Sequence, residues 1–166
     1  MSHNVQISGV KINDLDALET AMAELRREGI NVSLERGEPG TRVVRFRTYS
    51  GFGNNPMADH VIRLPGASYD IGLLKQPSGH YEPVYDNALG LSVACPIACE
   101  YKPGNQLNYR AITDRTELDL ASRGIGIGKL MQRYTAVVAE RDARLRGYVA
   151  RRVTSNDGAL QVVITV

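Results

Sequence analysis

The segment that decides the fold is residues 13–29, NDLDALETAMAELRREG, which has the pattern of an amphipathic helix. Asn13 or Asp14 can cap its start, where carboxylates suit the positive end of the helix dipole. Gly29 follows the last turn and is placed to end the helix. The apolar side chains recur at a helical spacing and form one stripe, made of Leu15, Leu18, Met22 and Leu25. This stripe predicts a helix that packs on a core with one face.

Strand-like and helical segments follow each other outward from this helix. The predicted strands before the second helix are residues 5–12, 30–36, 41–50, 60–76 (interrupted near Pro65 and Gly66) and 81–86. The second helix starts between Glu117 and Lys129 and ends near Arg146. Residues 148–154 and 159–166 then form a hairpin around SNDG, whose Asp-Gly pair favours a tight turn. The order β-α-β-β-β-β-α-β-β predicts an α+β, two-layer domain with a mainly antiparallel sheet and two helices on one face.

Length and composition are those of one ordinary globular domain, 1–166. The chain has 166 residues, 43% hydrophobic and 23% charged, with a formal net charge of +2. We see neither a signal peptide nor a run of 18 apolar residues, and expect a soluble protein of a bacterial or host cytosol. Residues 86–116 have no sustained periodicity, so we expect an irregular insertion or interaction loop there.

A glycine run, residues 123–134 (RGIGIGKLMQRY), is the first candidate site. It fails the Walker spacing, because the position of the first glycine is Arg123 and Leu130 follows the lysine. It also fails the dinucleotide pattern, since its spacing is G-x-G-x-G. Two interpretations stay open: a hinge into the second helix, or an anion site at the helix N-terminus. The candidate anion-binding residues are Arg123, Gly124, Gly126, Gly128, Lys129 and Arg133.

Two further patterns bear on ligands. Cys95 and Cys99 form a single C-x-x-x-C pair, and a tetrahedral metal site commonly needs two such pairs, so we expect no metal. Residues 123–152 hold eight basic residues and only two acidic ones. With Arg45, Arg47 and Arg63, they predict either a basic surface for an acidic ligand or nucleic acid, or a solvated helix face.

Catalytic motifs are missing from the sequence. Ser, His and Asp occur without a G-x-S-x-G elbow or an H-E-x-x-H pair. Glu82 and Asp86 flank one strand end and could pair, as surface carboxylates often do. We predict no catalytic constellation and no cofactor, and therefore favour a non-enzyme.

Several short segments resemble a known family. They are the start MSH, INDLDALETAMAEL after the first strand, YDIGLL, YEPVYD, MQRYTAVV and the final DGALQVVITV. Together they resemble the hypothetical chloroplast reading frame thirty-five family of plastids, cyanobacteria, other bacteria and some phages. Residues 37–67 and 86–120 look longer than the compact pattern of that family, which favours a bacterial or phage origin. The resemblance implies the fold and an intracellular setting, but no known activity.

These observations lead to three functional hypotheses. The first is a non-catalytic binding or assembly protein that recognises a protein partner or associates with itself, since the predicted sheet has open edges. The second is a protein that binds or sequesters a small phosphorylated ligand or nucleotide at the glycine run. The third is nucleic-acid binding through the basic C-terminal half. None of the three involves a membrane.

Overall fold

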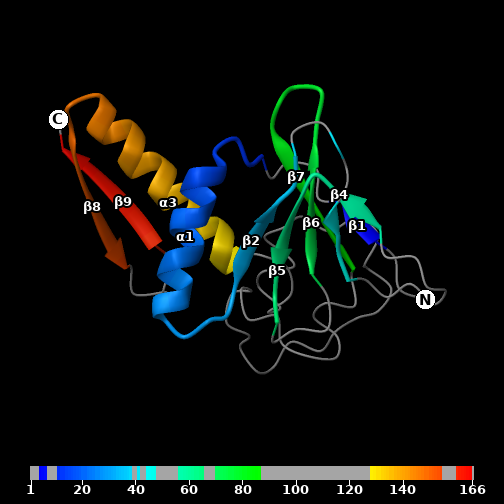
Figure 1. Ribbon diagram of the computed structural model, residues 1–166. Coiled ribbons are helices and arrows are strands. Elements are labelled where there is room, and N and C mark those ends of the chain that lie inside the picture. The colour runs from blue at the N-terminus through cyan, green and yellow to red at the C-terminus, as the bar shows by residue number, and fades with distance from the viewer. Residues whose placement is uncertain are drawn as a thin grey trace, which may run out of the picture.

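The computed structural model has an α+β fold, with antiparallel sheets and two helices among the residues that it describes (Figure 1). It describes residues 4–6, 11–38, 41, 44–47, 56–65, 70–86, 128–154 and 160–165. In chain order the elements are β1 (Asn4–Gln6), α1 (Leu15–Arg27), β2 (Ser33–Arg36), β3 (Val44–Arg45), β4 (Met57–Ala58), β5 (His60–Arg63), β6 (Ile71–Lys75), β7 (Tyr81–Asp86), α3 (Gly128–Leu145), β8 (Val149–Thr154) and β9 (Leu160–Thr165). The predicted insertion, residues 86–116, lies outside the described residues except for Asp86.

Local signals explain where α1 begins and ends. The carboxylate of Asp14 accepts hydrogen bonds from the backbone N–H groups of Asp16 and Ala17, at 2.9 and 2.8 Å. Gly29 follows the helix with a φ of +88°, a conformation that glycine adopts without steric cost. The predicted cap at Asp14 and the predicted end at Gly29 are therefore confirmed.

Five strands form the main sheet in the order β1-β7-β6-β5-β2, with every neighbouring pair antiparallel. The prediction of one interrupted strand over residues 60–76 is wrong, because β5 and β6 are separate strands that pair through His60 and Leu73. A further short strand, β4, lies within a segment predicted as a loop and pairs with β3. Among the described residues, six strands therefore lie between α1 and α3 in the sequence, where four were predicted.

The two faces of the sheet carry different packing, because successive side chains of a strand point to opposite sides. Ile62 and Leu73 are fully buried on the helix side. The opposite face holds a smaller cluster made of Val44, Phe46, Ala58, Val61 and Val84. Gly72 lies under the Phe46 ring, and a Cβ atom there would come within 2.6 Å of that ring. Glycine at this position therefore allows the second cluster to pack closely on β6.

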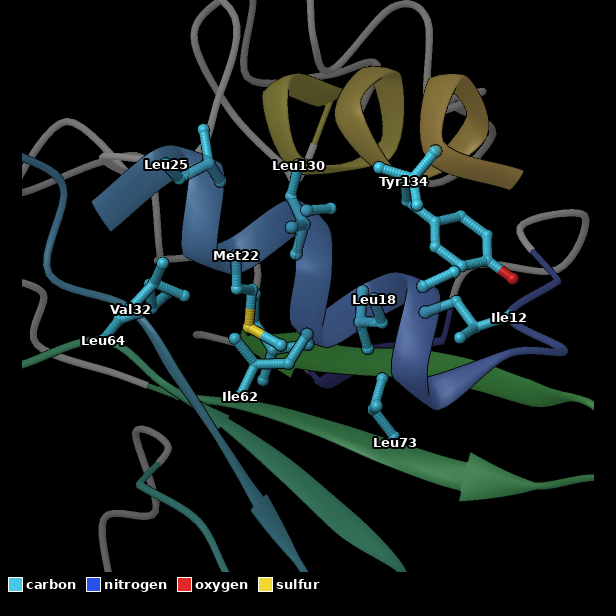
Figure 2. Close-up of a cluster of buried hydrophobic side chains, with 14 residues drawn as sticks. Ile12, Leu18, Met22, Leu25, Val32, Ile62, Leu64, Leu73, Leu130 and Tyr134 are labelled. Carbon is cyan, nitrogen blue, oxygen red and sulfur yellow. The ribbon is translucent and has the colours of Figure 1, made fainter. Parts of the chain in front are cut away.

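Both helices lie on the same side of the sheet, as predicted. Figure 2 shows α1 between α3 and the strands, with Leu18 and Met22 in the middle of the buried cluster. Leu130 and Tyr134 bring α3 into this core. The Tyr134 hydroxyl oxygen accepts hydrogen bonds from the backbone N–H groups of Asn13 and Asp14, at 2.9 and 3.2 Å. A residue of α3 thus helps to satisfy the free N–H groups at the start of α1.

The C-terminal hairpin is present as predicted and forms a sheet of its own. Strand β8 pairs with β9 along its whole length, from Val149 opposite Thr165 to Thr154 opposite Leu160. The hairpin packs on α3, so the helix pair lies between it and the main sheet (Figure 1). Neither of the two described helices is long and apolar enough to cross a membrane.

Candidate functional site

The predicted anion site is only partly within the described residues. Gly128 opens α3, whereas Arg123, Gly124 and Gly126 lie outside the described ranges. The Lys129 ammonium lies 3.3 Å from a carboxylate oxygen of Glu28, the residue that follows α1. The Arg133 guanidinium pairs with the same carboxylate. The two described cations of the predicted anion site, Lys129 and Arg133, thus already face a carboxylate of the protein itself.

Most of the remaining described cations of the basic segment, residues 123–152, also pair with carboxylates of the protein. Arg141 of α3 contacts the Asp14 carboxylate at 3.0 Å, and Arg146 pairs with Asp142 one turn earlier. Arg152 of β8 pairs with Glu24 of α1 and Glu140 of α3, each at 2.6 Å. The hydrogen bonds that Arg152 donates to Glu24 and then to Glu140 raise the pKa of Arg152. Arg152 therefore joins the hairpin to both helices.

A second group of cations surrounds a buried carboxylate. Asp70 is fully buried and accepts hydrogen bonds from the Arg47 side chain, the Arg63 side chain and the Leu64 backbone N–H. Burial raises the pKa of Asp70, but the hydrogen bonds from Arg47 and its other partners outweigh it and lower the pKa to about 2. Of the three arginines predicted to form a basic strand surface, Arg47 and Arg63 therefore bind Asp70. Arg45 is exposed.

A line of three polar side chains lies at the β6–β7 turn, and sequence reasoning missed it. The Ser78 hydroxyl lies 2.6 Å from Nδ1 of His80, and Nε2 of His80 lies 3.2 Å from a carboxylate oxygen of Glu82. His80 is 7% exposed, whereas Ser78 is exposed. The spacing S-x-H-x-E could have revealed part of the group, because His80 and Glu82 are alternate residues where the chain enters β7. Glu82 thus contacts His80; the side chain of Asp86, its predicted partner, lies outside the description.

The turn itself explains why Ser78 and His80 meet. The Gly79 N–H donates to the Gln76 carbonyl oxygen at 2.9 Å, and Gly79 has a φ of +90°. A proline after Gln76 and a glycine in the left-handed region are typical of a type I turn followed by a bulge. The glycine places His80 immediately before β7, with Nδ1 of its ring near the Ser78 hydroxyl.

The hairpin β8–β9 presents apolar side chains to solvent. Val149 is 70% exposed, and Val153 and Val163 are 36% and 42% exposed. These three residues occupy alternate positions of their strands, on the face opposite Arg152 and its carboxylate partners. Leu145, at the end of α3 beside the hairpin, is 87% exposed. The outer face of the β8–β9 hairpin and the end of α3 are therefore available for contact with another molecule.

Comparisons with models of protein families, with curated proteins and with solved structures give no match. The resemblance to the hypothetical chloroplast reading frame thirty-five family thus stays a prediction. Any functional conclusion therefore rests on the residues themselves.

Metal binding receives no support from the part of the chain that the structure describes. No group of three or more His, Cys, Asp or Glu side chains there is arranged to hold a metal ion. Cys95 and Cys99 lie outside these ranges. Two features of the described residues could act on another molecule: the outer surface of the hairpin and the line from Ser78 to Glu82.

Proposed function

We propose that this chain is an intracellular binding or assembly protein, of bacterial or phage origin, that associates with a second copy of itself through strand β9. The single observation that carries the proposal is the pairing of β9: among the described strands it pairs only with β8. An unpaired strand edge offers a row of backbone donors and acceptors to another strand.

The composition of the two hairpin strands favours β9 over β8 as the interface. Strand β9 reads LQVVIT, with no charged residue, proline or glycine. Strand β8 contains the consecutive residues Arg151 and Arg152, and pairing two β8 edges would bring these charges together. Charged residues are a common means of keeping an edge strand from pairing. Self-association through β9 avoids this repulsion and places four strands in one sheet.

The hairpin also has a physical reason to accept more strands. A sheet of two strands is marginal by itself in water, and this one is supported on one face by α3. An antiparallel β9–β9 pairing about a two-fold axis would give the order β8-β9-β9-β8. The exposed side chains of Val153 and Val163 would then lie on a larger continuous surface. Symmetric pairing of this kind is the commonest form of dimer.

The two other functional hypotheses receive less support from the described residues. A phosphorylated ligand at the N-terminus of α3 would have to compete with Glu28 for Lys129 and Arg133. Nucleic-acid binding through the basic segment would meet similar competition, because Arg141 and Arg152 already pair with carboxylates. Arg144 and Arg151 form no ion pair with any described residue, and two cations are a small footprint for nucleic acid.

The test is the molar mass in solution, measured by size-exclusion chromatography with light scattering over a wide concentration range. We expect the wild type to pass from monomer to dimer as concentration rises. Val163→Lys places a charge on β9 and should keep the protein monomeric at concentrations where the wild type is a dimer. Met57→Lys is the matched control, because Met57 is similarly exposed, at 44%, but lies on β4.

Two outcomes would count against the proposal. A wild type that stays monomeric at the highest concentration reached would exclude self-association. A dimer that both lysine variants retain would place the interface elsewhere than β9. Circular dichroism of each variant establishes that the lysine has not unfolded the hairpin or the helices.

A further inference from the structure

We propose that Ser78 is a nucleophilic serine that accepts an acyl group from an activated carboxylic ester, with His80 as its general base. Glu82 acts through His80 and is a positioning residue. The three side chains form a continuous line of hydrogen bonds, with 2.6 Å between Ser78 and His80 and 3.2 Å between His80 and Glu82. This reactivity is separate from the assembly surface, which lies on β9.

The carboxylate of Glu82 determines how His80 can act. An ionised carboxylate only accepts hydrogen bonds, so Nε2 of His80 carries the proton that points toward Glu82. In neutral imidazole this leaves the lone pair on Nδ1, toward which the Ser78 hydroxyl donates. A nucleophile that contacts a base, which is in turn oriented by a third group, is the arrangement that activates serine. The chemistry requires one ring nitrogen as acceptor and the other as donor, and both are present.

Burial separates the base from solvent while leaving the nucleophile accessible. The side chains of His80 and Glu82 are 9% and 14% exposed. Ser78 is exposed at the tip of the turn, so a substrate from solution can reach its hydroxyl oxygen. A carboxylate that is shielded from water stabilises a developing imidazolium more strongly than a solvated one does. The Glu82 carboxylate therefore lies where it can stabilise the positive charge that develops on His80 as Ser78 loses its proton.

The reaction is balanced without any cofactor. The Ser78 Oγ atom forms a bond to the carbonyl carbon of the ester while its proton passes to Nδ1 of His80. The bond between that carbon and the alkoxy oxygen then breaks, and the leaving alcohol takes the proton from His80. Water attacks the acyl-serine in the same way, returning Ser78 and releasing a carboxylic acid.

Covalent labelling with a fluorophosphonate probe tests the proposal. The Ser78 oxygen would displace fluoride from phosphorus, and intact-mass and peptide mass spectrometry would locate the adduct. We expect labelling at Ser78 in the full-length protein, complete loss in Ser78→Ala, and unchanged labelling in Ser33→Ala, where another exposed serine is removed. His80→Gln should slow labelling about 100-fold, which is the usual contribution of a general base.

The Glu82→Gln variant distinguishes a positioning role from a purely structural one. Glutamine can still accept the hydrogen bond from His80 but carries no charge. We expect labelling of Ser78 to continue more slowly, because the imidazolium that forms during the reaction loses its carboxylate partner. If the wild type is not labelled at Ser78, or if Glu82→Gln and His80→Gln label at the wild-type rate, the three side chains only stabilise the turn. Thermal melts establish whether each variant is folded. If His80→Gln does not fold, the labelling rate of Glu82→Gln still tests the role of the three side chains.

Discussion

Replacing Asp70 with asparagine should remove the strongest polar anchor in the described part of the sheet. Asp70 is fully buried beside β6 and accepts hydrogen bonds from the Arg47 and Arg63 side chains. Its carboxylate also accepts from the backbone N–H groups of Arg47 and Leu64, at 3.1 and 3.2 Å. Asparagine has one acceptor oxygen and brings two donors, so some of these donors lose their partner in the variant.

The magnitude follows from the pKa of Asp70 and from the exposure of its partners. Its pKa is about 2 in the folded protein against 3.8 ordinarily, which corresponds to about 2 kcal/mol of stability at neutral pH. Breaking a buried ion pair typically costs 3–5 kcal/mol, because the partner charge stays uncompensated. The side chains of Arg47 and Arg63 are 44% and 29% exposed, so water can solvate them in part. We therefore expect Asp70→Asn to lower the free energy of unfolding by about 3 kcal/mol at pH 7.

The pH dependence has a definite sign. The folded-state pKa of Asp70 is lowered, so its contribution is complete above pH 3.8 and disappears as the pH falls toward 2. The difference in stability between wild type and variant should be constant from pH 7 to pH 5. By pH 3 the difference in stability should be smaller by about 1 kcal/mol. At that pH the carboxyl group of Asp70 is protonated in most unfolded chains, whereas it stays ionised in most folded ones.

Urea denaturation followed by far-ultraviolet circular dichroism measures both quantities. The chain has no tryptophan, so the signal of α1 and α3 is the practical probe. Asn31→Asp, which adds a carboxylate at an exposed position, is a control for general charge effects. A loss below 1 kcal/mol at pH 7, or a difference that does not narrow between pH 5 and pH 3, would refute the reasoning about Asp70.

Two other substitutions probe the core and the buried imidazole. Gly72→Ala should cost about 1–3 kcal/mol, because its methyl group meets the ring of Phe46, which is only 2% exposed and has little room to move; an unchanged urea midpoint would contradict this. Burial lowers the pKa of His60 below its ordinary 6.5, so the unfolded chain binds the proton first and wild-type stability should fall below pH 6.5, by at most about 1.4 kcal/mol per pH unit. His60→Gln should remove this component, and parallel stability curves for the two proteins between pH 7 and pH 5 would show that His60 does not titrate in this way.

The elements that local signals specify were predictable from the sequence. Helix α1 has its cap at Asp14, its apolar stripe and its terminal Gly29 within 16 residues, and all three act where the sequence indicates. The closing hairpin has an equally local signal in its Asp-Gly turn. The division of residues 60–76 into β5 and β6 was not predictable in this way. Alternating apolar residues on both sides of Pro65 fit one interrupted strand as well as two antiparallel strands, because periodicity does not report the direction of the chain.

Charge was the least reliable guide to the site, for a physical reason. The basic segment lies in one stretch of sequence, but its partners Asp14, Glu24 and Glu28 lie more than 100 residues earlier. A net charge counted over a window cannot include carboxylates that folding brings to the same place. The cations of this segment therefore predicted an acidic partner, and most of the carboxylates that they meet among the described residues lie in helix α1 or directly beside its ends.

The line from Ser78 to Glu82 has the opposite property, because its three members lie within five residues. No long-range contact was needed to place them together; a strand period of two and a turn at Gly79 were sufficient. What the sequence could not supply was the burial of His80, which is 7% exposed in the folded protein. Because His80 is buried, the Ser78 hydroxyl contacts a base that is shielded from solvent, and the spacing alone does not provide this. Selective labelling of Ser78 thus asks whether burial at this turn is sufficient to change the reactivity of an otherwise ordinary serine.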